Sequence, residues 1–213
     1  CYTSWCGPCK NMTNNVFPQK AAGDYFNPRF VCVKYDMEKG EGPELAKRFG
    51  VRGYPTFLIL RPDGTVQHKI VGGGDLDKFI AKVEKGLNEK TSLDYLNKIY
   101  EKGKMNKKQL MTYSVVLNEA YEKDKSEKVG KELDAVLKEK DKMKKEYWPI
   151  LERSPYGSDN FKLVLNNIGT FNKNIGKENV DKYLTSCYKN AINNTMRPNT
   201  KEPLKVLQQI QEE

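Results

Sequence analysis

The residues of this 213-residue chain whose types and spacing could do chemistry are Cys6 and Cys9, two thiols with two residues between them. They stand in the run WCGPCK at residues 5–10. Two thiols at this spacing, at the start of a helix, can exchange between a dithiol and a disulfide with little backbone movement. The same C-x-x-C spacing also occurs as half of a zinc site, as part of a haem attachment and by coincidence.

The rest of the sequence does not favour a zinc site or a haem attachment as the interpretation of the cysteine pair. A structural zinc site usually needs four ligands, and this chain has no second C-x-x-C and one histidine, His68. A c-type haem attachment requires histidine directly after the second cysteine, where this chain has Lys10. The residues therefore favour a redox pair, with a metal-binding or inert pair as the alternative. No metal or organic cofactor is expected, because the two sulfurs carry the electrons.

Further elements follow the cysteines in a definite order. They are a strand at 30–36, a helix and loop at 44–53, a Tyr54-Pro55-Thr56 turn, a hairpin of strands at 57–60 and 66–72, and a final helix at 75–87. Together with the cysteine motif, they resemble the thioredoxin superfamily over residues 1–88. Residues 16–27 and 36–40 are similar to bacterial thioredoxin-like domains, including soluble reductant-carrying domains of the periplasm. The resemblance implies an α/β thioredoxin-like domain.

The resemblance also implies roles for residues around the cysteines. Trp5, Gly7 and Pro8 correspond to the active-site loop, and Trp5 is expected in the apolar contact surface around the first cysteine. The Tyr54–Pro55 bond corresponds to a cis-proline turn that lies against the cysteines and pairs with an extended substrate segment. The alternatives are a Trp5 side chain that fills the core and a trans proline that opens the following strand.

The two cysteines are expected to play different parts. We expect Cys6 at or just before the first helical turn, where backbone N–H groups and the helix dipole stabilise a thiolate. Such a position lowers a thiol pKa from about 8.5 to near or below neutrality. Cys6 is then the nucleophile that attacks a substrate disulfide, and Cys9 resolves the mixed disulfide. The Gly-Pro pair resembles reducing thioredoxins, with potentials near about −270 mV, more than oxidising relatives near about −120 mV.

The amino-terminal side of the domain is short relative to the family. Thioredoxin-like folds place a strand, a helix and a central strand before the C-x-x-C, and here only residues 1–5 precede Cys6. An apolar run such as 57–60 needs partners on both edges to be a buried strand. We therefore expect a longer protein, in which the strand–helix–strand unit of about 25 residues or more precedes Cys1.

The other cysteines and the histidine are expected to have no catalytic part. Cys32 alternates with valines in the expected strand, and buried free cysteine behaves as a small apolar residue. Cys1, Cys32 and Cys187 are therefore interpreted as structural. His68 stands between Gln67 and Lys69 and is expected at the surface.

The sequence changes character near residue 89. Apolar residues recur at helical spacing in segments of roughly 10 to 17 residues joined by short polar turns, as in antiparallel helix pairs. We expect residues 89–213 to form an all-α helical-hairpin or bundle domain. Similar glycine turns at 103–106 and 176–179 suggest a tetratricopeptide-like repeat, but no full signature recurs at a fixed period. The chain ends at Glu213 within an expected helix, so the helical domain is also expected to continue beyond it.

Net charge and hydropathy limit the classes of partner that this chain is expected to bind. The net charge is +9, from 37 Lys+Arg and 28 Asp+Glu. The lysines from 138 to 145 are interleaved with acidic residues, and a short basic cluster comprises Lys102, Lys104, Lys107 and Lys108. No aromatic–basic motif is present, so nucleic acid is not expected as a partner. No segment reaches the roughly 18 apolar residues needed to span a membrane.

The sequence is consistent with two alternative functions. The first is a thiol–disulfide oxidoreductase that reduces protein disulfides and receives electrons from an unidentified donor, with a partner protein possible on the helical domain. The second is a helical interaction or scaffold protein that uses the thioredoxin-like unit as a binding platform. The family resemblance suggests the bacterial periplasm or envelope, with the cytoplasm as the alternative.

Overall fold

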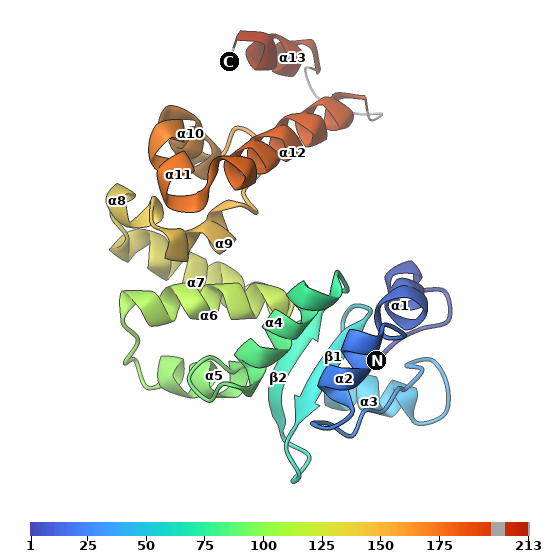
Figure 1. The fold of residues 1–213 in the computed structure, drawn as a ribbon. Coiled ribbons are helices and arrows are strands. Elements are labelled where there is room, and N and C mark those ends of the chain that lie inside the picture. Colours follow the sequence, from blue (N-terminus) through green and yellow to red (C-terminus); the bar gives the residue numbers. More distant parts are fainter. Residues whose placement is uncertain (197–202, 213) are drawn as a thin grey trace. The chain divides into compact units, whose positions relative to one another are not determined.

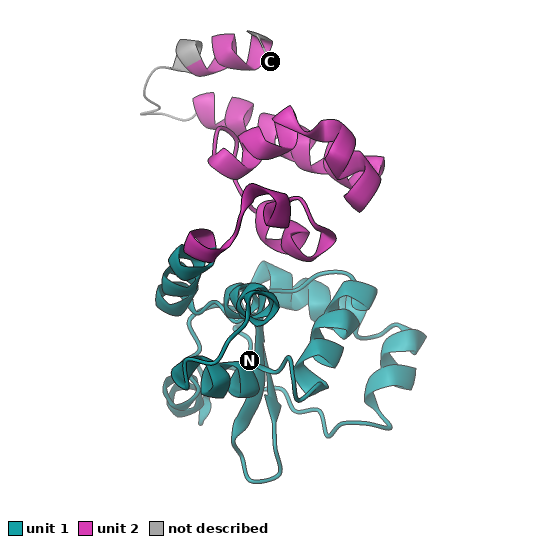
Figure 2. Ribbon diagram, turned by 90° about the vertical axis from the view of Figure 1, so that its left-hand side faces the viewer, with its two compact units in different colours: residues 1–133 teal, residues 134–213 magenta. Residues whose placement is uncertain are grey.

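The computed structural model describes residues 1–196 and 203–212, and Glu213 lies outside the described part. The chain forms two compact units, residues 1–133 and 134–213, shown in teal and magenta in Figure 2. This division falls later than the predicted domain boundary at 88/89, because the first helices after that boundary pack against the thioredoxin-like part. Each unit is described separately.

The first unit is an α/β domain followed by helices (Figure 1). Its elements are α1 (Gly7–Asn11), the π-helical η1 (Met12–Val16), α2 (Lys20–Phe26), α3 (Gly42–Arg48), β1 (Thr56–Leu60), β2 (Val66–Val71), α4 (Leu76–Leu87), α5 (Leu93–Glu101), α6 (Lys107–Glu119) and most of α7 (Lys123–Val136). The small sheet followed by a mostly helical region confirms the predicted fold class.

Strands β1 and β2 pair as an antiparallel hairpin, as the sequence predicts. The register places Phe57 opposite Ile70 and Ile59 opposite His68, with an irregularity after Ile59. The connecting turn contains Gly64 at φ +80°, a conformation that glycine adopts at little cost.

An apolar core joins this hairpin to η1, α2 and α4. The fully buried members are Met12, Val16, Ala22, Ile70, Leu76, Phe79 and Val83. Aromatic rings close the core, with Phe57 and Phe79 at a centroid distance of 4.5 Å. Because Met12 begins the helical turn after α1, the core that stabilises the hairpin also fixes the segment that carries the cysteines.

The predicted strand at 30–36 does not form, which corrects the sequence-based expectation. Residues 31–35 have no strand assignment, and the segment has a single bridge, between Tyr2 and Asp36. Tyr2 donates its N–H to the Tyr35 carbonyl and accepts the Met37 N–H. Alternating valines do not make a strand by themselves, because a strand also requires a partner for its backbone groups.

Strand β2 is also covered by α5 and α6, which lie beyond the predicted domain boundary. Two ion pairs connect the sheet and α4 to the end of α6: Lys69 of β2 with Glu122, which follows α6, and Lys85 of α4 with Glu119 of α6. The Lys85 ammonium donates to both Glu119 oxygens at 2.9 Å, and the Glu119 side chain is 7% exposed. The first helices of the helical region are therefore part of the unit that contains the sheet.

The prediction that His68 lies at the surface is wrong. The His68 side chain is fully buried, and its Nδ1 accepts the backbone N–H of Leu93 at 3.0 Å. Gly86 lies directly against the ring, since a Cβ at Gly86 would stand 2.5 Å from the His68 Cδ2 atom. The polar neighbours of His68 in the sequence indicated a solvated strand, but α4 and α5 cover this position.

The second unit is helical throughout its described elements. These are α8 (Glu139–Lys142), the 3-10 turn η2 (Lys145–Tyr147), α9 (Trp148–Leu151), α10 (Asp159–Asn166), α11 (Ile168–Ile175), α12 (Lys177–Thr195) and α13 (Pro203–Glu212). Its core contains Trp148, Phe161 and Phe171, with Trp148 packed edge-on against Tyr183 at 5.5 Å. The tetratricopeptide-like repeat stays a prediction.

Within the described residues, no helix has both the length and the apolar character that crossing a membrane requires.

The contact between Gly86 and His68 gives a stability prediction. Gly86→Ala should lower the free energy of unfolding by about 1–3 kcal/mol, because the added methyl group has no room beside a buried ring. The matched control is Gly130→Ala in α7, where nothing lies within 4 Å of the new Cβ. This control should gain about 0.5–1 kcal/mol from the helix preference for alanine. Urea unfolding of both variants measures the difference, and equal stability of the two would contradict the packing described.

Candidate active site

Cys6 and Cys9 form a disulfide at the amino-terminal end of α1. The S–S distance is 2.05 Å and the two Cα atoms are 5.3 Å apart. Cys6 is the N-cap residue of α1, and its Sγ accepts the Cys9 backbone N–H at 3.1 Å. The two side chains are 3% and 4% exposed, so exposure does not distinguish them.

The N-cap position does distinguish the two sulfurs. A backbone N–H that already points at the Cys6 sulfur stabilises negative charge there when the disulfide is reduced. Cys9 is inside the helix, where the backbone N–H groups of the following residues turn back to carbonyl oxygens. Helix α1 has five residues, so this hydrogen bond, more than a long helix dipole, is the stabilising interaction. This difference is the basis for the expectation that Cys6 attacks and Cys9 resolves.

The predicted loop residues surround the disulfide. Gly7 and Pro8 are exposed between the cysteines, and Pro8 occupies the first turn of α1. Proline is favourable there, because its missing N–H would have no partner within the helix.

A second backbone segment approaches this turn from the end of β2. A Cβ at Gly73 would stand 3.7 Å from the Pro8 carbonyl oxygen and 3.0 Å from Met12 side-chain atoms, so only glycine fits without displacement. The neighbouring Gly72 donates its N–H to the Pro55 carbonyl oxygen at 2.8 Å. Gly72 and Gly73 thus bring the end of β2, the proline turn and the cysteine turn together.

The proline turn and Trp5 form one side of the site. The Tyr54–Pro55 peptide bond is cis. The Tyr54 ring packs edge-on against the Trp5 indole, with a centroid distance of 6.0 Å and an interplanar angle of 83°. Trp5 is 65% exposed, so the alternative of a core-filling tryptophan is wrong.

Sequence reasoning missed Glu38, which holds Trp5 from the other side. The indole Nε1 donates to the Glu38 carboxylate at 2.8 Å. The loop that carries Glu38 is closely packed, since a Cβ at Gly42 would stand 1.9 Å from the Asp36 carbonyl oxygen. No local signal in the sequence relates residues 33 positions apart, so this contact becomes visible only in the fold.

The three remaining cysteines differ in their exposure to solvent. Cys187 is buried in the second unit, where burial raises the pKa of its thiol and Sγ donates to the Ser154 carbonyl. Cys1 is half-buried. Cys32 is exposed, so its interpretation as a buried structural cysteine is wrong. The reason is that the segment around it forms no strand and nothing described covers it.

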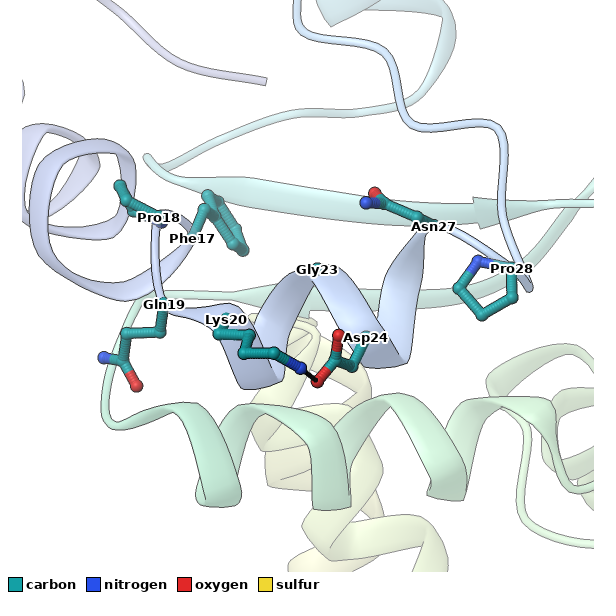
Figure 3. Close-up of a pocket in the computed structure, with 8 residues that line it drawn as sticks. All are labelled: Phe17, Pro18, Gln19, Lys20, Gly23, Asp24, Asn27 and Pro28. Carbon is teal, nitrogen blue, oxygen red and sulfur yellow. Dashed lines mark hydrogen bonds and ion pairs between the residues drawn. The ribbon is translucent and has the colours of Figure 1, made fainter.

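The described residues also bear on two other kinds of site, a metal site and a pocket. No group of three or more His, Cys, Asp or Glu side chains there could hold a metal ion. An open hollow runs along α2, and its lining includes Phe17, Asn27 and Pro28 (Figure 3). Its walls also carry the exposed Lys20–Asp24 ion pair, and none of its lining residues belongs to the cysteine or proline turns.

Comparisons with known proteins agree with this geometry. Residues 1–85 match the family model Thioredoxin. The chain is 37% identical over 76 residues to thioredoxin-1 of Drosophila melanogaster, covering 32% of this chain and 66% of that protein. Residues 1–85 therefore form a thioredoxin-like domain.

Other relatives of the thioredoxin-like domain include a protein disulfide-isomerase of Datisca glomerata, 31% identical over 84 residues, which cover 39% of this chain and 17% of that protein. A solution structure of a candidate disulphide-isomerase from Bacteroides thetaiotaomicron has 46% identity, covers 41% of this chain and 73% of that one, and gives a TM-score of 0.39. The chain spans just under two thirds of thioredoxin-1 and a much smaller share of the plant isomerase.

The different positions of the two sulfurs give a trapping prediction. Cys9→Ser should accumulate a mixed disulfide with a protein disulfide substrate, because Cys6 can still attack but nothing resolves the product. Cys6→Ser should accumulate none. Non-reducing gel electrophoresis after incubation with the substrate measures both.

The exposed thiol of Cys32 provides a control for this trapping experiment. Cys32→Ser introduced into the Cys9→Ser background should leave the trapped complex unchanged. Trapping on Cys6→Ser in place of Cys9→Ser would reverse the assigned roles.

Proposed function

We propose that the thioredoxin-like domain reduces disulfides of protein substrates through the Cys6–Cys9 pair. The observation that carries the proposal is the hydrogen bond from the Cys9 N–H to the Cys6 sulfur at the N-cap of α1. This bond supports the assignment of Cys6 as the reactive sulfur, and the cis-proline turn lies near the cysteine turn. The match of residues 1–85 to the Thioredoxin family model and the similarity to proteins named thioredoxin and disulfide-isomerase support the same reaction class.

In the proposed reaction, atoms and electrons balance between the two cysteine sulfurs and the substrate disulfide. The Cys6 thiolate attacks one substrate sulfur, the substrate S–S bond breaks, and the released thiolate takes a proton. The Cys9 thiolate then attacks the Cys6 sulfur, which releases the second substrate thiol. The protein is left with the Cys6–Cys9 disulfide, as in this structure. A dithiol donor must return two electrons before the next cycle.

Docking of the substrate is proposed along the proline turn. In the described part of the chain, no hydrogen bond involves the backbone N–H or C=O of Tyr54, although the flanking Gly53 and Pro55 carbonyls are both bonded. Tyr54 therefore has free backbone groups that can pair with an extended segment. The exposed indole of Trp5, fixed by Glu38 and Tyr54, supplies apolar contact area beside it.

The direction of electron flow is tested by the reduction potential. Equilibration of the protein with glutathione or dithiothreitol buffers, followed by thiol alkylation and mass spectrometry, should give a potential near about −270 mV. Catalysed reduction of insulin should accompany it. A potential near about −120 mV would make the pair a disulfide donor, and the absence of a reversible pair would support the scaffold function in its place.

The role of Trp5 in docking gives a separate prediction. Trp5→Ala should lower kcat/KM for insulin by about tenfold, since a truncated aromatic contact in an interface commonly costs this much. The reduction potential should stay unchanged, because the hydrogen bond to the Cys6 sulfur does not involve the indole. Trp5→Phe is the matched control and should retain most of the activity. An equal loss of activity for small-molecule disulfides would show that Trp5 acts on the cysteines and not on docking.

A further inference from the structure

His68 is the single histidine of this chain, and it lies at the joint between the sheet and the helices that follow the family match. We propose that this joint is an acid-released latch, closed by neutral His68 and opened when that side chain is protonated. The opened state separates α5 and α6 from β2. The proposal does not depend on the redox function, because it rests on contacts away from the cysteines.

The latch is built from close contacts of the imidazole with α4 and with the start of α5. The ring is fully buried, with Gly86 of α4 against its Cγ and Cδ2 atoms. Nδ1 accepts the N–H of Leu93, the first residue of α5. The neighbouring Gln67 side chain donates to the Gly86 carbonyl at 3.0 Å. The end of α4, the start of α5 and strand β2 thus meet at one buried ring.

The hydrogen bond fixes the protonation state in which the latch can close. Because Nδ1 accepts a hydrogen bond, the proton of the neutral ring resides on Nε2. Nε2 is buried and has no hydrogen-bond partner among the described residues. Protonation adds the ring's second N–H hydrogen, on Nδ1, where it faces the Leu93 N–H. It also puts a positive charge at the amino-terminal end of α5, the end that disfavours cations.

Both acidic and basic side chains lie near the His68 ring. Glu119 of α6 attracts the imidazolium, and Lys85 of α4 repels it, while these two side chains pair with each other. Lys69 of β2 is paired with Glu122. At the start of α5, Asp94 is bound by Arg61 and Lys98.

Burial affects the pKa of His68 more than these charges do. It lowers the pKa of His68 from 6.5 to about 4, with Glu119 opposing the shift and Lys85 adding to it. The neutral form is therefore favoured when the joint is closed.

The sign of the pH dependence follows from this lowered pKa. The closed joint is fully stabilised above the ordinary histidine pKa of 6.5, where the ring is neutral in both states. As pH falls from 6.5 toward 4, the open state takes up the proton first, and the closed state loses stability. The ratio of closed to open molecules should fall on the order of tenfold between pH 7 and pH 5.

Hydrogen exchange on the full chain tests the latch. Amide protection factors, which are corrected for the intrinsic pH dependence of exchange, are measured by mass spectrometry at pH 7 and pH 5. We expect a loss on the order of tenfold in α5 and α6, with little change in α10 to α12. Uniform protection at both pH values, or an equal loss across both units, would overturn the proposal.

A variant separates His68 from the carboxylates that also titrate in acid. His68→Asn retains an acceptor oxygen bonded to Cγ, where histidine has Nδ1, but cannot be protonated. Its α5 and α6 amides should show the same protection at both pH values. A pH-dependent loss that persists in this variant would assign the opening to acidic groups and overturn the latch.

A measurement on the unaltered protein covers the case in which His68→Asn fails to fold. With one histidine in the chain, its ring signals in a two-dimensional NMR spectrum need no assignment by mutagenesis. The titration midpoint should lie well below 6.5, so the loss of protection in α5 and α6 should begin at a higher pH than the titration of the closed protein. Ordinary titration near 6.5 in the closed protein would contradict the burial on which the latch depends.

Discussion

The pairing of β1 with β2 is the contact on which the rest of the first unit depends. One face of this hairpin receives η1, α2 and α4, and their shared core fixes the helical segment that begins with the cysteines. The end of β2 is tied to the proline turn by the bond from the Gly72 N–H to Pro55. A two-stranded hairpin alone is marginally stable, so the helices packed against it are also what keeps the site assembled.

The parts of the site that the sequence predicted are those encoded by local chemistry. The cis Tyr54–Pro55 bond is implied by the family resemblance alone. A cysteine N-cap and a proline in the first helical turn depend on neighbours close in the chain. The hairpin follows from the apolar run at 57–60 and the turn residues that end at Gly64. These features are readable because the residues that define them lie within a few positions of one another.

The features that the sequence did not predict depend on contacts between distant segments. His68 reads as exposed from its polar neighbours, but helices from two later segments cover it. Residues 30–36 have the composition of a strand, yet strand formation requires a backbone partner along the whole segment. Glu38 reaches Trp5 through a packed loop that no pattern in the sequence connects to the tryptophan.

The exposed position of Trp5 has an optical consequence. The chain contains two tryptophans, and they fall in different units and different environments. Trp5 is 65% exposed beside the cysteines, whereas Trp148 is 8% exposed in the helical core of the second unit. An aqueous quencher such as iodide therefore acts on the emission of the first indole and leaves the second nearly unaffected. Intrinsic fluorescence thus follows each unit separately, without any label attached to the protein.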